Sequence, residues 1–425
     1  MVFGEIFSVL KFVKTVDNIL KFTEKISPPK ETYNTVLRDP NANRNFEAEK
    51  KLKKSSKEIV ATGNVIKENL VIREDVQKLS EETKQGLQEM SEKIQELTDQ
   101  MTYQFNELKA FITVHHFSAN CVTPVLTMMK YLQMVIETPC HDTFGMFREN
   151  CQSPTPLRCA MDLISLLEQD VTNPLKKAME VDPMRTTATF RKWQLFFNEL
   201  LGKLLILECM VNGMFWAQNM IGPDKLCEEI VEFQDLMDDW EDEYRNDKNG
   251  YWPAVKSLRD RVEEKYDHLG NKEKAEFLEK ELGKILTNHA FYIIVYDYCE
   301  SFGQLSITHS DQLLESSGTR NCCIVIYRSF EMNNGHSKTS EDLKTLEVQV
   351  EACRHNTLPE DVWQSEFAKT LQKNRLSNTG FVALIRQRRN PVIRHVNSWR
   401  KWGPGWWITA YTGNNAHWIL IAGYR

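Results

Sequence analysis

Two short segments carry the residue types of a cysteine hydrolase. Cys353 lies in residues 351–355 (EACRH), and His417 lies in residues 415–424 (NAHWILIAGY). A cysteine attacks a carbonyl group as its thiolate, and an imidazole within hydrogen-bond reach can take up the thiol proton. Both segments are short, and strand sequences of this kind resemble one another by chance. We therefore expect His417 to be a packed or surface histidine of a hairpin, and hydrolysis ranks third among three functional hypotheses.

The other chemistry-bearing residues do not form a metal or nucleotide site. In the acidic run of residues 224–247, aligning Gly250 with the glycine of a calcium loop puts Arg245 and Lys256 at positions that need oxygen ligands. His115 and His116 are adjacent, not four residues apart as on a zinc-binding helix. The glycines of residues 403–405 lack the third glycine and the helix of a phosphate loop. The sequence therefore predicts no metal and no cofactor. The acidic run reads as a solvated helix face, with docking onto a basic tail as the alternative.

The C-terminal region is basic and rich in tryptophan. The last 59 residues hold ten basic side chains, no acidic ones and five of the ten tryptophans, although the whole chain has a formal net charge of −6. Arginine and tryptophan together suit anionic headgroups, phosphates or sugars. We predict contact with an anionic membrane or an acidic protein surface. Nucleic acid is disfavoured, because no nucleic-acid-binding module is recognised and the rest of the chain is acidic. The candidate residues are Arg386, Arg388, Arg389, Arg400, Lys401, Trp402, Trp406 and Trp407.

Residues 1–26 form an amphipathic helix that Pro28 and Pro29 stop. Its apolar face is wide. Such a helix either packs in a bundle or enters the interface of a bilayer. The membrane-insertion candidates are Phe3, Ile6, Phe7, Val9, Leu10, Val13, Val16 and Leu20.

Long helices must position these segments. Residues 76–112 carry apolar residues in alternating steps of three and four, a heptad-like seam that needs a long partner helix from this chain or from a second copy. Residues 31–56 read as a connector or a short helix. Further helices are expected over residues 122–137, 157–180, 185–220, 223–247, 253–268, 271–288 and 359–375. Strands are expected over residues 291–296, 322–327 and 381–385, followed by a hairpin of residues 406–411 and 417–422.

These elements predict a mainly α fold. An elongated helical bundle with long coiled-coil-like helices, residues 1–290, precedes a small C-terminal α+β domain, residues 291–425. The apolar stretch 195–216 contains three charged residues and reads as a core helix, not as a membrane span.

The N-terminal sequence and the cysteines indicate where in the cell the protein is expected. Charged residues interrupt the first apolar stretch, so no ordinary signal peptide is seen, which favours a cytoplasmic or peripheral membrane location. Ten cysteines leave secretion open, because Cys140, Cys151 and Cys159 could staple a loop, whereas the scattered ones read as buried thiols.

The order of features resembles that of rapunzel-like and cephalotoxin-like metazoan proteins. The resemblance rests on the coiled stretch from Ser91 to Leu108 and on the strand Phe291–Asp297 (FYIIVYD) directly after the helical part. It implies a protein without enzymatic activity that acts on a membrane or surface. The layout is also similar to that of α-helical pore-forming toxins, in which long helices bundle and an amphipathic segment inserts.

We therefore expect a non-enzymatic, membrane-interacting protein, in which the basic tail docks on an anionic surface and helix 1–26 inserts. The second hypothesis is a cytosolic coiled-coil scaffold, with a homo-oligomer formed through the helix of residues 76–112. The third is a papain-like cysteine hydrolase.

Overall fold

A computed structural model gives the structure of the chain. It describes the backbone of residues 15, 40–71, 81–109, 117–216, 219–266, 268–297, 302–307, 310–315, 322–330, 379–387, 391–396, 407–412 and 416–424. The side chains of these residues are described except in 40–46, 68–71, 81–83, 107, 109, 302–307, 310, 315, 379–387, 407–412 and 416–424.

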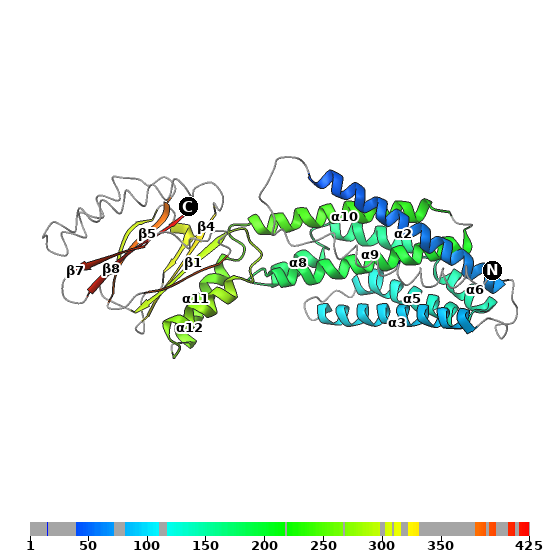
Figure 1. Cartoon of the computed structure of the whole chain (residues 1–425), viewed down its shortest axis with the longest axis horizontal. Coiled ribbons are helices and arrows are strands. Elements are labelled where there is room, and N and C mark those ends of the chain that lie inside the picture. The colour runs from blue at the N-terminus through cyan, green and yellow to red at the C-terminus, as the bar shows by residue number, and fades with distance from the viewer. Residues whose placement is uncertain are drawn as a thin grey trace. The chain divides into compact units, whose positions relative to one another are not determined.

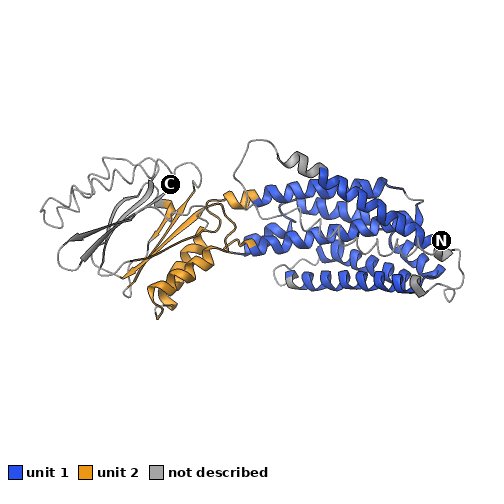
Figure 2. Ribbon diagram, viewed as in Figure 1, with its two compact units in different colours: residues 1–182, 188–241 blue, residues 183–187, 242–425 orange. Residues whose placement is uncertain are grey.

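The chain divides into two compact units, which are coloured separately in Figure 2. Unit 1 comprises residues 1–182 and 188–241, and unit 2 comprises residues 183–187 and 242–425. The division therefore falls near residue 242, not at residue 290 as the sequence suggests. Two helices before residue 290 share a hydrophobic core with the strands that follow, which explains the difference.

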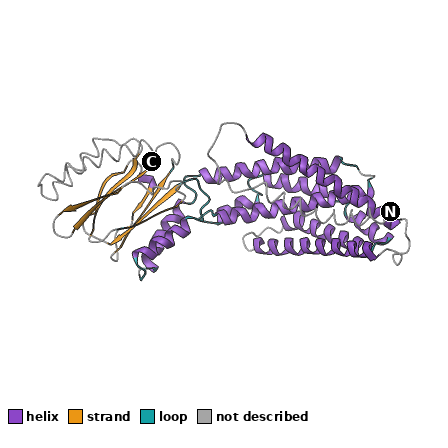
Figure 3. Ribbon diagram, in the orientation of Figure 1, coloured by secondary structure: helices purple, strands orange, loops and turns teal. Residues whose placement is uncertain are grey.

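Unit 1 is a bundle of helices (Figures 1 and 3). Its helices are α2 (Pro40–Val71), α3 (Glu81–Lys109), α5 (Thr123–Glu137), α6 (His141–Asn150), α7 (Pro156–Glu168), α8 (Pro174–Val181), α9 (Thr187–Phe215) and most of α10 (Ile221–Asn246). A π-helical turn, Ser118–Val122, leads into α5. The mainly α fold with a helical bundle is confirmed.

Helix α9 is enclosed by the rest of the bundle. Every residue from Phe196 to Met214 is buried. A helix covered on all sides is apolar around its whole circumference, so its sequence shows no amphipathic period. The predicted core helix is confirmed. Among the described residues, none of the helices combines the length and the apolar character that crossing a membrane requires.

The polar side chains buried along α9 have partners. Lys203 Nζ lies 3.1 Å from Glu199 Oε1, one turn earlier in the same helix. Glu208 Oε2 accepts the backbone N–H of Leu157 at 3.0 Å, at the first turn of α7. Burial lowers the pKa of Lys203 and raises the pKa of Glu208, because both charged forms lose solvation there.

The heptad-like seam of α3 is covered within the chain. Met90, Ile94, Leu97 and Met101 are buried, and α3 runs along α5. The seam is therefore explained without a second copy of the chain, and oligomerisation through this helix stays a prediction.

Helix α2 is much longer than the connector or short helix expected over residues 31–56, and that expectation is wrong. Its buried positions include Ala48, Leu52, Ser56, Ile59, Gly63 and Ile66. Two positions of this stripe are not apolar because they meet close neighbours. Ser56 Oγ lies 3.3 Å from Cys227 Sγ of α10. A Cβ on Gly63 would lie 3.1 Å from the carbonyl oxygen of Met210 in α9.

The segment predicted as one helix over residues 157–180 consists of α7 and α8. Asn173 separates them, because its side-chain oxygen accepts the N–H groups of Leu175 and Lys176 at 2.9 and 3.2 Å. Pro174 occupies the first position of α8, where proline is favoured.

The acidic run predicted as a helix face forms α10. Glu232, Asp235 and Asp239 of this helix are exposed, as a solvated face requires. Docking of this face onto the basic tail stays a prediction.

The cysteines that the structure describes are free thiols, so no bridge joins Cys140, Cys151 and Cys159. Cys140 is exposed and precedes α6, whereas the other seven are buried. The N–H of Thr143 lowers the pKa of Cys140 by hydrogen bonding to its sulfur. Burial raises the pKa of Cys121, Cys151 and Cys227 to about 12.

We expect iodoacetamide at neutral pH to alkylate Cys140 at least about tenfold faster than the buried cysteines, because the exposed thiolate is the reacting form. Peptide mass spectrometry over a time course measures the rates. Cys140→Ser is the matched variant and should abolish fast labelling of the peptide that contains residue 140. Equal rates at Cys140 and Cys151 would contradict the prediction.

The described residues of unit 2 form two antiparallel sheets and two α-helices that follow the end of α10. The strands are β1 (Ala290–Asp297), β2 (Phe302–Ile307), β3 (Leu313–Glu315), β4 (Cys322–Ser329), β5 (Thr379–Gln387), β6 (Val392–Val396), β7 (Trp407–Thr412) and β8 (Ala416–Tyr424). They are ordered β3-β4-β1-β6 and β2-β5-β8-β7. The helices are α11 (Trp252–Lys265) and α12 (Asn271–Leu282).

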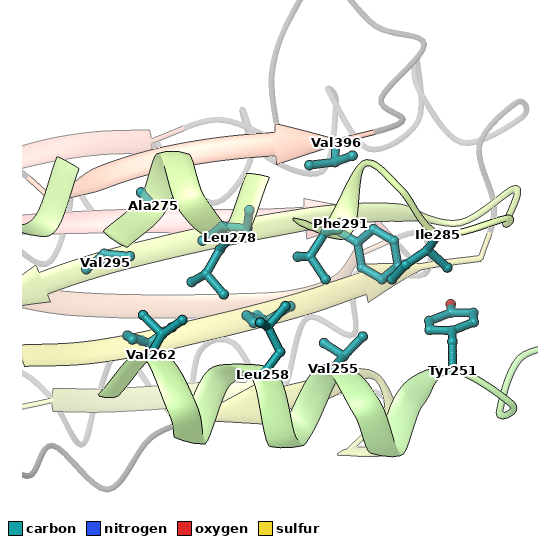
Figure 4. Packing of buried hydrophobic residues seen from close by; sticks show 14 of the residues in the cluster. Tyr251, Val255, Leu258, Val262, Ala275, Leu278, Ile285, Phe291, Val295 and Val396 are labelled. Atoms are coloured by element: carbon teal, nitrogen blue, oxygen red, sulfur yellow. The ribbon is translucent and has the colours of Figure 1, made fainter. Parts of the chain in front are cut away.

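Strand β1 is the centre of the first sheet and is buried on both faces, which is why it reads as a continuous apolar run. Phe291, Ile293 and Val295 share one core with α11 and α12, part of which Figure 4 shows. Tyr292 and Ile294 point to the other face and form a second core with side chains of β4. The predicted strand and the C-terminal α+β character are confirmed.

Candidate functional site

Most of the residues predicted to bind a membrane or an anionic surface lie outside the described residues. They are Phe3, Ile6, Phe7, Val9, Leu10, Val13, Val16, Leu20, Arg388, Arg389, Arg400, Lys401, Trp402 and Trp406.

Two of the predicted residues lie in described strands. Arg386 in β5 pairs in register with Trp418 of β8, and Trp407 at the start of β7 pairs with Ile421. The structure therefore brings an arginine and a tryptophan of the basic tail to neighbouring backbone positions. His417 lies in β8, in the hairpin that the sequence predicts, and Cys353 lies outside the described residues.

The most unusual polar group that the structure describes is the guanidinium of Arg328, at the end of β4. The residue is only 1% exposed. It donates to the backbone oxygens of Lys248 and Asp311, the latter at 3.2 Å, and Asn249 Oδ1 lies 3.4 Å away. A guanidinium removed from water is costly unless its N–H groups are used, and these contacts use several of them. Arg328 therefore fastens the loop between α10 and α11, and residue 311, to the sheet.

Aromatic rings enclose the same guanidinium. Its central carbon lies 4.1 Å from the ring centre of Trp252 and 5.0 Å from that of Phe330. The ammonium of Lys248 lies 4.9 Å from the same Phe330 ring. Cation–π contacts of this kind strengthen when they are shielded from water. We call Lys248, Tyr251, Trp252, His289, Arg328 and Phe330 the Arg328 cluster.

His289 and Tyr251 form the second half of the cluster. His289 Nδ1 lies 2.5 Å from the Tyr251 hydroxyl oxygen, and its ring centre lies 4.7 Å from that of Phe330. Burial, followed by the positive charges of Arg328 and Lys248, lowers the pKa of His289 to about 4. Burial raises the pKa of Tyr251. Both side chains are therefore neutral at pH 7.

Asp247, which directly precedes the cluster residue Lys248, is paired with Arg185, a residue far from it in the sequence. Arg185 and Asp247 form an ion pair, and Asp247 Oδ1 accepts the N–H groups of Asn249 and Gly250 at 2.9 and 3.1 Å. Burial opposes ionisation, yet these N–H groups and Arg185 hold the pKa of Asp247 below its ordinary value. A Cβ on Gly250 would meet the guanidinium of Arg185, so a larger residue there would have to displace the end of this side chain.

The residues just before His289 are hydrogen-bonded to the backbone of two other segments. The N–H of Leu286 donates to the Arg185 oxygen, and the N–H of Asn288 donates to the Arg245 oxygen, both at 2.9 Å. Residues 284–289 therefore hold both segments through which the chain enters unit 2.

This arrangement favours positioning over catalysis. In the Arg328 cluster the Tyr251 hydroxyl and the His289 imidazole are both buried and bind each other. No group of three or more histidine, cysteine, aspartate or glutamate residues that could hold a metal occurs in the part of the chain that the structure describes.

The sequence predictions missed this cluster. The available signals were an arginine ending an apolar strand and a Tyr-Trp-Pro segment opening a helix, at residues 251–253. Neither signal names its partner.

One family model matches most of the chain. It is described as "Protein of unknown function (DUF684)", and the match covers residues 85–418. The match includes most of α3 and the whole Arg328 cluster, whereas the predicted membrane-insertion helix and α2 precede it. No curated protein and no solved structure matches the sequence.

Proposed function

For this chain, which belongs to the DUF684 family of proteins of unknown function, we propose a non-enzymatic role at membranes, similar in kind to that of α-helical pore-forming toxins. The observation that carries the proposal is the turn between α9 and α10. Trp216 is 50% exposed and Ile221 is 77% exposed on this turn. Tryptophan beside an aliphatic residue is the composition that favours the interface of a bilayer.

Residues at both ends of the turn make hydrogen bonds or ring contacts within unit 1. The N–H of Asn219 donates to the Trp216 oxygen at 3.2 Å, and the N–H of Ile221 donates to Asn219 Oδ1 at 3.0 Å. Phe215 packs on Phe144 and Phe147 of α6, with ring centres 6.2 and 6.0 Å apart. Backbone that such contacts already hold loses little further conformational entropy when its side chains enter lipid. Two side chains are also far too small a surface for a stable protein interface, which buries about 800 Å² on each partner.

The predicted helix of residues 1–26 supplies a second membrane element. Thr15 is buried and donates to Glu58 Oε2 of α2 at 3.0 Å. On a helical wheel at about 100° per residue, Ile6 and Val13 lie about 160–180° from Thr15. Ile6 and Val13 are therefore expected on the face opposite the contact of Thr15 with Glu58, which supports their proposed role in the bilayer, whereas Phe7 and Val16 are expected about 80–100° from Thr15.

The basic tail supplies the attraction to an anionic surface. Each basic residue near an anionic membrane contributes about 1 kcal/mol, and the tail has no acidic residue to offset this. The register of Arg386 with Trp418 supports a surface that combines charge with an interfacial aromatic residue. We place the protein at the membrane periphery.

We expect Trp216→Ser with Ile221→Ser to weaken binding to anionic vesicles by at least about tenfold, because burying one such side chain contributes about 1.5–3 kcal/mol. Co-sedimentation with vesicles of phosphatidylcholine and phosphatidylserine measures the affinity, and release of a trapped dye reports leakage.

The matched control is Val171→Ser with Val181→Ser, which removes two exposed apolar side chains, 78% and 64% exposed, from other segments of unit 1. This variant should bind as the unaltered chain does. Equal binding by both double variants would remove the turn from the proposal. No binding of the unaltered chain to any vesicle would overturn the membrane function itself.

The scaffold alternative makes a different prediction. A scaffold that pairs through α3 is a dimer without lipid, which mass measurement in solution tests. The burial of Met90, Ile94 and Leu97 within the chain gives this alternative no specific support.

A further inference from the structure

We propose that the Arg328 cluster is an acid-sensitive latch, in which protonation of His289 releases the loop of residues 247–251 from the start of β1 and the end of β4. The latch lies within unit 2 and does not depend on the membrane function proposed above.

His289 joins the loop to the start of β1 through a hydrogen bond, beside the packing of Tyr251 on Phe291, whose ring centres are 5.7 Å apart. Its Nδ1 lies 2.5 Å from the hydroxyl oxygen of Tyr251, at the end of the loop. Its own backbone N–H donates to Thr287 Oγ1 at 3.1 Å, which fixes the residue just before β1. Phe330 covers the ring from the end of β4. The residue is 3% exposed, so a charge on the ring has little access to water.

We assign Nδ1 as the acceptor and the Tyr251 hydroxyl as the donor. Protonation converts Nδ1 into a donor, so this hydrogen bond breaks or reverses, and the Tyr251 proton loses its acceptor. The new positive charge arises where two positive charges already lie near, Arg328 of β4 and Lys248 of the loop. Repulsion from these charges and the loss of solvation both disfavour the closed form once His289 is protonated.

Acidic groups near the cluster do not offset this charge. Asp247 of the loop raises the pKa of His289, but this effect is smaller than the lowering by Arg328 and by Lys248. Its carboxylate is engaged by Arg185 and by the N–H groups of Asn249 and Gly250. Asp311 lies nearer the Arg328 side of the cluster, where its backbone oxygen accepts from the guanidinium. Opening the loop is the remaining way to solvate the imidazolium.

The direction of the pH effect follows from the two pKa values. The pKa of His289 is about 4 in the closed latch, against an ordinary value of 6.5 that applies once the ring reaches water. The open form therefore binds the proton first as the pH falls. The stability that neutral His289 gives the closed latch is fully present above pH 6.5 and is lost progressively as the pH falls from 6.5 to 4. These values give an opening equilibrium about 20-fold larger at pH 5 than at pH 7.

Hydrogen exchange of the full chain tests the latch. After correction for the intrinsic pH dependence of exchange, peptides that cover residues 247–256 should exchange about 20-fold faster at pH 5 than at pH 7. In His289→Gln the side-chain oxygen can still accept from Tyr251 but cannot be protonated, so the corrected rate should stay constant. His395→Gln, which alters an exposed histidine of β6, is the matched control and should behave as the unaltered chain does.

A pH response in His289→Gln equal to that of the unaltered chain would overturn the latch. A second measurement covers the case in which His289→Gln does not fold. In the unaltered chain, NMR of labelled histidine should show His289 taking up its proton over the same pH range in which residues 247–256 lose protection. Loss of protection while His289 stays neutral would overturn the proposal as well.

Discussion

Replacing Gly213 with alanine should cost unit 1 about 3 kcal/mol of unfolding free energy, although alanine is the better helix former. A Cβ at this position would lie 2.2 Å from the carbonyl oxygen of Val60 and 3.0 Å from the Cα of Gly63. These atoms belong to the backbone of α2, so no side chain can rotate away. The two helices must separate by about 1 Å, and the contacts beside the crossing are lost.

Two further glycines make the prediction specific. At Gly63 the nearest atom to a Cβ is the Met210 oxygen at 3.1 Å, so Gly63→Ala should cost less than Gly213→Ala. At Gly145 of α6 a Cβ meets nothing within 4 Å. Gly145→Ala should therefore stabilise the chain, by up to about 1 kcal/mol, because alanine restricts the unfolded state. Native-state hydrogen exchange of peptides from α2 and α9 measures all three variants. Equal effects at Gly213 and Gly145 would contradict the close helix crossing.

The same crossing explains why the sequence predicts α9 but not α2. Helix α9 is rich in apolar residues over most of its length, and this composition is visible without any partner. The buried stripe of α2 contains Ser56 and Gly63, which look polar or helix-breaking in isolation. Both are explained by residues far along the chain, Cys227 and Gly213. Close packing between distant segments leaves no local signal, so a single sequence does not reveal it.

A similar reason explains why the sequence predicts some strands and not others. Strands β1 and β4 are buried and carry continuous apolar runs, so the sequence predicts them. Strands β2, β3 and β6 lie at the edges of their sheets and are not predicted, whereas the edge strand β7 is predicted from the aromatic and aliphatic residues of 406–411. An edge strand has one neighbour and tolerates polar residues such as Arg394 and the exposed His395 of β6. The candidate site was missed because Arg328 meets partners at residues 248, 252 and 311, and only the fold brings these together.

Replacing Arg328 with leucine should cost unit 2 about 3 kcal/mol. The change removes the donor to the backbone oxygens of Lys248 and Asp311, and a hydrogen bond to a charged group contributes about 1.5–3 kcal/mol. It also removes the cation that lies 4.1 Å from the Trp252 ring centre. Arg328→Lys should recover little of this loss, because an ammonium cannot reproduce the planar guanidinium that reaches the two oxygens and stacks on Trp252.

The surface arginine of the same sheet is the matched control for this effect. Arg394 of β6 lies 3.3 Å from Glu276 and 3.4 Å from Glu279 of α12, but its side chain is 32% exposed. Arg394→Gln should cost less than about 1 kcal/mol, because water screens a pair of this kind. Hydrogen exchange of peptides from β1 and β4 under mild denaturant compares the variants. A loss at Arg328 no larger than that at Arg394 would mean that the enclosing aromatic rings, and not the guanidinium, hold the loop onto the sheet.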